Sequence, residues 1–182
     1  TFIEEIHKEN VPPQTGRTLT EDEIWNIRLA DGNNYNEIKH LIQSASIAPN
    51  TRDDLGSPLL FGVKSTQVLG LLIDNGLNIH ATDEFQCNAL HNGVRGFMPP
   101  DIIDMLIQVG VDLNAKNHIG STPLIEAAEA GDFEAAKILI KHGADIHHAP
   151  EYGETALKTA ENQDYTDESE VNEQGRKKIA AL

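Results

Sequence analysis

Apolar positions along this chain fall into short runs that recur at a nearly constant spacing. Three such runs end in a glycine, at Gly76, Gly110 and Gly143, so these glycines lie 34 and then 33 residues apart. The apolar residues between 135 and 140 follow the three- and four-residue spacing of one helix face. A period of this length predicts stacked copies of one small structural unit.

The clearest copy runs from Gly120 to Gly153. Thr122 and Pro123 predict a helix start, because threonine caps free backbone N–H groups and proline suits the first helical turn. Leucine and alanines over 124–128 give this first helix a packing stripe. Gly131 interrupts the pattern, and the apolar run 135–140 predicts a second helix, which the glycine at 143 ends in a left-handed C-cap.

This unit resembles the ankyrin repeat, which has about 33 residues and opens with Gly-x-Thr-Pro-Leu-His. The match covers Gly120–Leu124, and weaker copies of the opening occur at 56–59, 86–91 and 153–157. The resemblance implies an all-α repeat solenoid of helix-turn-helix units with β-hairpin fingers, comprising about five repeats with degenerate ends. The expected ankyrin domain is 18–182, with repeats at about 18–52, 53–83, 84–117, 118–150 and 151–182.

Both ends of this array depart from the repeat. Residues Thr20–Glu23 form a capping box that predicts the first helix of a degenerate repeat. Residues 1–17 are expected to be an N-terminal arm or a short docked helix. In the last repeat, an acidic insertion at about 162–174 delays the second helix until about residue 176, and its role is open.

The middle repeats are irregular as well. The second is one residue short near Ser57, and the third has Gln86 in place of the opening glycine. The third also has a longer turn between its helices, and Pro99 and Pro100 predict that the following helix begins at about Asp101. These changes could shape a particular contact or be neutral drift.

The resemblance places partner binding on the fingertips and on the concave face of the inner helices. The position before the opening glycine is normally exposed at the fingertip, and here it is apolar in four repeats: Leu55, Phe85, Ile119 and Tyr152. Polar residues surround it: Asp54, Glu84, His118, Glu151 and Glu154. We therefore expect an apolar stripe inside an acidic collar, as protein interfaces often are. The alternative is that these side chains pack between adjacent fingers.

Positions on the inner helices that usually face the groove add further candidates. They hold Lys64, Arg95, Glu129 and Ala130. Glu126 stands where the family commonly has leucine, so we expect its carboxylate to reach solvent.

Charge and composition narrow the partner. With 14 Lys+Arg against 29 Asp+Glu, the net charge of −15 disfavours nucleic acid and anionic membranes and favours a basic protein, although it could also serve only solubility. No apolar run approaches the roughly 20 residues that span a bilayer. The single Cys87 excludes an internal disulfide and fits the cytoplasm. A periplasmic or secreted location stays open, because a signal could precede Thr1.

The histidines and the cysteine do not form a recognisable catalytic or metal motif. Through the resemblance, His80 and His147 share with Asn114 a position that braces the finger backbone, and His91 matches the histidine that bonds to neighbouring loop backbone. Cys87 lacks the base, orienting group and oxyanion site that a nucleophile needs. We therefore expect neither an enzyme nor a cofactor or metal.

The sequence as a whole predicts a monomeric, non-enzymatic module that binds a protein partner. The compact acidic array favours a specific inhibitor or immunity-type protein that neutralises a basic toxin or effector. The alternative is a scaffold or adaptor fragment that tethers several proteins. An enzyme or enzyme subunit is a third class and would require a bound metal or cofactor.

Overall fold

The computed structural model describes residues 20, 22, 27, 35–44, 49–96, 98–151, 153–161, 174 and 177–182. The chain divides into two compact units, Thr1–Ala81 and Thr82–Leu182. The expected N-terminal arm, most of the first expected helix, and the acidic insertion apart from Gln174 lie outside the described residues.

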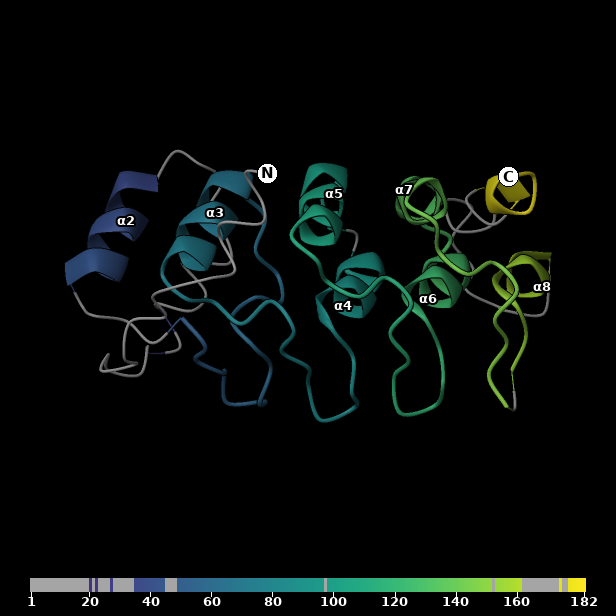
Figure 1. Cartoon of the computed structure of the whole chain (residues 1–182), viewed down its shortest axis with the longest axis horizontal. Helices are drawn as coiled ribbons and strands as arrows, with labels where there is room; N and C mark the ends of the chain where they lie inside the picture. Colours follow the sequence, from purple (N-terminus) through teal and green to yellow (C-terminus); the bar gives the residue numbers. More distant parts are fainter. Residues whose placement is uncertain are drawn as a thin grey trace. The chain divides into compact units, whose positions relative to one another are not determined.

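The first unit contains two described helices that pack against each other, α2 (Tyr35–Ser44) and α3 (Thr66–Asp74) (Figure 1). An amphipathic sequence gives α2 one buried face, which includes Ile38 and Ile42. Ser65 caps α3 by accepting a hydrogen bond from the backbone N–H of Val68 at 3.4 Å. The unit therefore buries its apolar residues between consecutive outer helices, as the repeat pattern predicts.

The second repeat lacks the inner α-helix that the resemblance implies. Residues 59–62 form turns instead, and Gly62 adopts a left-handed conformation with φ of +90°. The apolar side chains of this stretch, Leu59 to Phe61, are nevertheless buried. The one-residue deletion and Gly62 together replace a helical turn, so the expectation that Lys64 lies on an inner helix is wrong, since it directly precedes the Ser65 cap.

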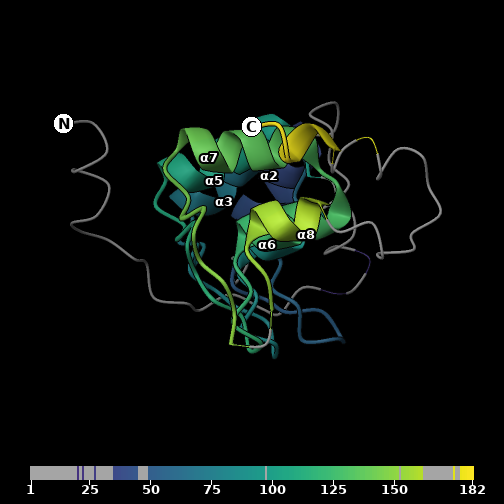
Figure 2. The same cartoon turned by 90° about the vertical axis from the view of Figure 1, so that its right-hand side faces the viewer.

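The second unit consists of two helical layers with fingers on one side (Figures 1 and 2). The inner layer contains α4 (Ala89–Arg95), α6 (Pro123–Ala130) and α8 (Ala156–Glu161), with α6 packed between the other two. The outer layer contains α5 (Pro100–Gln108) and α7 (Phe133–Lys141). A short helical turn at 177–179 lies beside α7. This arrangement is the helix-turn-helix solenoid that the sequence predicts.

The helix ends follow the local sequence closely. The two prolines 99 and 100 start α5 one residue before the expected position. Gly131 and Gly143 take left-handed conformations after α6 and α7, with φ of 70° and 89°. The prediction for Thr122 is only half right: it is the N-cap of α6, but its buried hydroxyl makes no capping hydrogen bond. Pro123 still favours the helix start, because its fixed φ suits the first helical turn.

Small side chains allow the inner helices to pack closely. Ala127 and Ala128 of α6 are fully buried, as are Ala89 and Leu90 of α4. The described finger segments contain turns and one isolated antiparallel bridge, between Arg52 and Pro58, rather than the extended hairpins that the family resemblance implies. Among the described helices, none has the length and apolar character to cross a bilayer.

Candidate protein-binding surface

Three finger loops turn around one polar side chain near their start. Asp53 Oδ1 accepts hydrogen bonds from the backbone N–H groups two and four residues later, at 3.0 and 2.8 Å. Asp83 makes the same pair at 2.9 and 2.9 Å, and Asn117 makes it at 3.1 and 3.0 Å. These local bonds fix the conformation of each tip and thereby position the residue that follows two places later. Sequence reasoning missed them, although the recurrence of Asp or Asn at this place was visible.

The residue after three of the tip positions is held in the left-handed region. Gly56 and Gly120 have φ of 75° and 81°, and Gln86 has φ of 60° at the equivalent place in the third repeat. The fingertip geometry is therefore preserved where the glycine is missing. Because a side chain disfavours this conformation, the third fingertip is strained.

The apolar fingertip side chains are exposed. In the first unit Leu55 is 83% exposed, and in the second unit Phe85 is 50% and Ile119 60% exposed. Tyr152, the fourth member of the expected stripe, lies outside the described residues. The second unit thus presents two large apolar side chains on consecutive fingers.

These two fingers are joined to each other through His118. The carbonyl oxygen of Phe85 accepts from the backbone N–H of His118 at 2.9 Å and lies 3.0 Å from its Nδ1. The rings of Phe85 and His118 lie 5.3 Å apart at 45°. Since a carbonyl can only accept, Nδ1 carries the proton. Phe85 therefore packs against the next finger, and half of its side chain remains accessible.

The polar collar residues are exposed. They include Glu84 and His118 beside the two apolar tips, Glu151 and Glu154 on the following finger, and Asp54 in the first unit. A row of carboxylates beside apolar side chains suits a partner that offers both basic and apolar groups.

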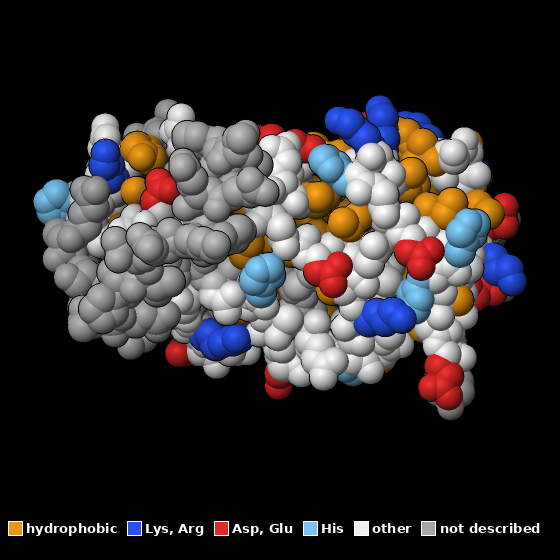
Figure 3. Space-filling view, viewed as in Figure 1, with side chains coloured by type: hydrophobic (Ala, Val, Ile, Leu, Met, Phe, Trp, Pro, Cys, Tyr) orange, Lys and Arg blue, Asp and Glu red, His pale blue; other side chains and the backbone are white. Residues whose placement is uncertain are grey.

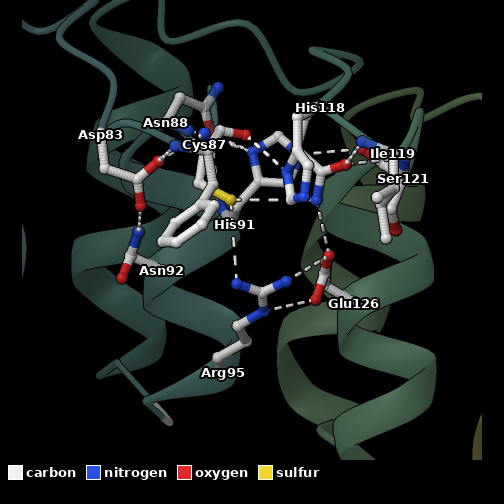
Figure 4. Close-up of polar contacts among 12 residues, drawn as sticks. Asp83, Cys87, Asn88, His91, Asn92, Arg95, His118, Ile119, Ser121 and Glu126 are labelled. Atoms are coloured by element: carbon white, nitrogen blue, oxygen red, sulfur yellow. Dashed lines mark hydrogen bonds and ion pairs between the residues drawn. The ribbon is translucent and has the colours of Figure 1, made fainter.

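The expectation that Glu126 reaches solvent is wrong (Figure 4). Its side chain is only 2% exposed, because Arg95 of the preceding repeat binds it through two N–H···O bonds of 2.5 and 2.8 Å. Asn117 donates a third bond at 2.9 Å. Three hydrogen bonds compensate for desolvating the carboxylate, so it can occupy a family leucine position. Arg95 itself is 47% exposed.

Glu129 lies one turn further along α6 and is half-buried. Burial raises the pKa of its carboxyl above the ordinary value, the negative charge of Glu126 adds to this, and Arg95 partly offsets it. The inner-helix candidates therefore form one ionic group of a single cation and two carboxyls, in which only the guanidinium is substantially exposed.

Cys87 is buried beside this group. Its Sγ lies 3.8 Å from Nη1 of Arg95 and from Nδ2 of Asn117. Burial raises the pKa of the thiol, and the carboxylate of Asp83 raises it further. The thiol therefore stays protonated at neutral pH, which is unlike the thiolate of a catalytic cysteine.

His91 joins two repeats from inside the core. Its ring is fully buried, and its Nε2 lies 3.0 Å from the carbonyl oxygen of Ser121 in the next repeat. Because a carbonyl can only accept, Nε2 donates. Nδ1 lies 3.2 Å from the backbone N of Asn88 and 2.8 Å from its side-chain Oδ1. Burial lowers the pKa of His91, which keeps the ring neutral. The contact with neighbouring loop backbone is the one that the resemblance implies.

Of the three residues at the position expected to brace the finger backbone, one does so through its side chain. Asn114 accepts from the backbone N–H of Asp145 in the next repeat at 2.8 Å, as the resemblance implies. His80 and His147 are exposed, and only their backbone N–H groups make hydrogen bonds, to Asn78 and Asp145. Across the described ranges, no group of three histidine, cysteine or carboxylate side chains could hold a metal ion.

Comparison with known proteins agrees with the repeat architecture. A family model described as ankyrin repeats in three copies matches residues 90–167. A Rickettsia bellii protein named for ankyrin repeats is 59% identical over 49 residues, which is 26% of this chain and 28% of that protein. A second Rickettsia bellii protein with the same name is 32% identical over 102 residues, or 55% of this chain and 56% of that protein.

A eukaryotic relative shows similar identity over a shorter stretch. Protein phosphatase 1 regulatory subunit 12A of Mus musculus is 38% identical over 61 residues, which is 34% of this chain and 6% of that protein. The chain thus spans between 6% and 56% of the length of these three relatives. The similarity resides in the repeats.

Proposed function

The chain belongs to the ankyrin-repeat family, a module for protein–protein interaction, and we propose that it recognises one protein partner through the fingertips that carry Phe85 and Ile119. The observation that carries this proposal is the exposure of two large apolar side chains on consecutive fingers that are bonded to each other. An aromatic anchor on a preorganised loop loses little conformational entropy on binding, and such anchors dominate the energetics of interfaces.

The charge beside the tips favours a basic partner. Glu84, Glu151 and Glu154 are exposed, and the chain carries a net charge of −15. Carboxylates at the rim of an interface accelerate association with a positively charged surface and disfavour an acidic one. The mechanism is binding alone: the apolar tips enter the partner and the collar orients it.

A specific inhibitor is the biological role that we propose for this surface. A monomer that covers one face of a basic toxin or effector would neutralise it without any catalytic step. One relative that aligns with this chain over 61 residues is by name a regulatory subunit of a phosphatase, and by analogy we propose a regulatory role here. We propose a cytoplasmic location, because the single cysteine is buried and unpaired, as suits a reducing compartment.

Affinity capture from the native source separates an inhibitor from a scaffold. Wild type and the double variant Phe85→Ala/Ile119→Ala are immobilised at equal density, and the bound proteins are identified and quantified. We expect one basic protein, captured at a one-to-one ratio by the wild type and lost with the double variant. Capture of several proteins in equal amounts by both forms would contradict the single-partner proposal.

The collar is tested by the kinetics of association with that partner. Replacing Glu84, Glu151 and Glu154 by glutamine removes three negative charges and keeps the size of each side chain. We expect a slower association rate with a weaker dependence on salt, and a dissociation rate that changes little, because rim charges act mainly on encounter. An association rate that is insensitive to salt in the wild type would exclude electrostatic steering by the collar.

A scaffold or adaptor is the second candidate function. It is favoured by one specific observation, an exposed group of lysines on the outer layer of the second unit.

A further inference from the structure

The outer layer of the second unit carries a basic surface in an otherwise acidic chain. Four exposed lysines lie on α7 and the C-terminal helical turn: Lys137, Lys141, Lys177 and Lys178. The whole chain has only 14 Lys+Arg, so a substantial share of them lies on this one face. Figure 3 shows Lys and Arg side chains gathered at the upper right of the view, over α7. We call these four residues the lysine patch.

Two of these lysines come together on one aromatic ring. Nζ of Lys137 lies 5.9 Å from the centroid of Phe133, and Nζ of Lys178 lies 5.8 Å from the same centroid. The ring attracts both cations through its quadrupole, which offsets part of their mutual repulsion. Two segments that are distant in the sequence therefore present positive charge at one place.

Among the described residues of α7 and the C-terminal turn, Glu134 is the exposed carboxylate that accompanies the four lysines. Asp104 on α5 accepts a bond of 2.7 Å from Nε2 of His142 and another from Gln108, so it is already engaged. The charge of Lys141 also contributes, after the bond to His142, to the lowered pKa of Asp104.

We propose that the lysine patch is a second docking surface, which binds an acidic segment of a protein. It lies on the outer helical layer, whereas the fingertips project from the inner side of the same unit (Figure 2). A short run of carboxylates matches four lysines, while a long polyanion would also meet the field of a chain with net charge −15. Acidic peptide is therefore favoured over nucleic acid or an anionic membrane.

This proposal does not rest on the fingertip function. If both surfaces act, the protein joins a basic partner on its fingers to an acidic partner on its outer layer, which is the behaviour of an adaptor.

Fluorescence anisotropy with a fluorescein-labelled glutamate-rich peptide tests the lysine patch in the full chain. The test variant is Lys137→Glu/Lys178→Glu, and the control is Lys116→Glu/Lys158→Glu, which changes the net charge equally at exposed positions outside the patch. We expect the dissociation constant to rise at least about tenfold in the test variant. The control and Phe85→Ala/Ile119→Ala should bind like the wild type. The same peptide with glutamine in place of glutamate should not bind.

Several outcomes would overturn the proposal. Equal loss in the test and control variants would mean that only net charge matters. If the glutamate-rich peptide does not bind the wild type, the lysine patch is not a docking surface for acidic peptides. Tighter binding of single-stranded DNA, or of vesicles of phosphatidylcholine and phosphatidylserine, lost in the test variant alone, would assign the patch to a different class of macromolecule. Thermal unfolding of each variant checks that the fold is kept, and Lys141→Glu/Lys177→Glu provides an independent second test.

Discussion

The two partners of the ion pair between Glu126 and Arg95 differ in their exposure to solvent, so each needs the other to a different degree. Glu126 is 2% exposed, while Arg95 is 47% exposed. Without Arg95, the carboxylate would be buried with Asn117 as its remaining side-chain partner. Without Glu126, the guanidinium could turn to water. The cost of breaking the pair should therefore depend on which residue is removed.

Arg95→Ala should lower the free energy of unfolding by about 2 kcal/mol, because it leaves a buried carboxylate without its charged partner. Glu126→Leu should change it by less than about 1 kcal/mol, since an apolar side chain of similar size can fill the site. Urea denaturation of both variants measures these values. The double variant should be more stable than Arg95→Ala alone. If the double variant is less stable than either single variant, the destabilisation by Arg95→Ala does not come from leaving the Glu126 carboxylate without its charged partner.

Gln86 holds a conformation that glycine adopts in two other fingers. Its φ of 60° compares with 75° at Gly56 and 81° at Gly120. The hydrogen bonds that Asp83 accepts from the backbone N–H groups of Phe85 and Cys87 impose this conformation locally. The strain therefore lies next to the exposed Phe85.

Gln86→Gly should raise the free energy of unfolding by about 1 kcal/mol, because relief of the left-handed strain exceeds the entropy that glycine adds to the unfolded chain. The matched exchange Gly120→Gln should lower it by about the same amount, as φ there is positive and a Cβ would meet only ordinary contacts with Pro150. Chemical denaturation of the two variants checks the signs. Two changes of the same sign would contradict the strain argument.

At the residue scale, the resemblance to the ankyrin repeat was enough to place the exposed fingertip residues Phe85 and Ile119. The same resemblance implied that His91 bonds to neighbouring loop backbone, as its contact with Ser121 shows. The burial of Glu126 could not be predicted, because its partner lies 31 residues away and no local pattern links the two.

Helices and turns were predictable where the local signals were strong. Prolines and glycines marked the ends of α5, α6 and α7 to within a residue or so. The missing inner helix of the second repeat was not anticipated, because the apolar residues at 59–61 are buried whether they form a helix or turns.

Successive repeats of the second unit are joined by side chains that reach from one repeat to the next. His91 on α4 bonds to the carbonyl of Ser121 before α6, and Asn114 accepts from the backbone N–H of Asp145 at 2.8 Å. His91 is fully buried, and burial lowers its pKa because the charged ring is disfavoured there. Protonating the ring in the folded chain therefore costs free energy.

The stability that His91 provides should depend on pH. Burial lowers its folded pKa below the ordinary value of 6.5, so above that value the contribution is fully present. As the pH falls through 6.5 toward the lower folded pKa, the unfolded chain binds a proton that the folded chain does not, and stability is lost. The difference in unfolding free energy between wild type and His91→Asn should thus shrink as the pH falls from neutral to about 5.5. A difference that is constant over this range would contradict the assignment of a buried neutral ring.

At the scale of the whole molecule, negative and positive charges lie on different faces of the second unit. The second unit presents carboxylates and two apolar tips on its fingers and lysines on its outer layer. The acidic balance was evident from composition, whereas the gathering of lysines from α7 and the C-terminal turn required the fold, since these segments are far apart in the sequence.

The most direct measurement is calorimetric titration of the captured partner into the wild type, Phe85→Ala/Ile119→Ala, and the control Ile146→Ala. The control removes an apolar side chain that is also about half exposed in the second unit and lies in the turn after α7, at neither of the two fingertip positions. We expect the fingertip variant to weaken binding by at least about tenfold and the control by less than about twofold. Equal affinities for the wild type and the fingertip variant would show that the partner binds another surface.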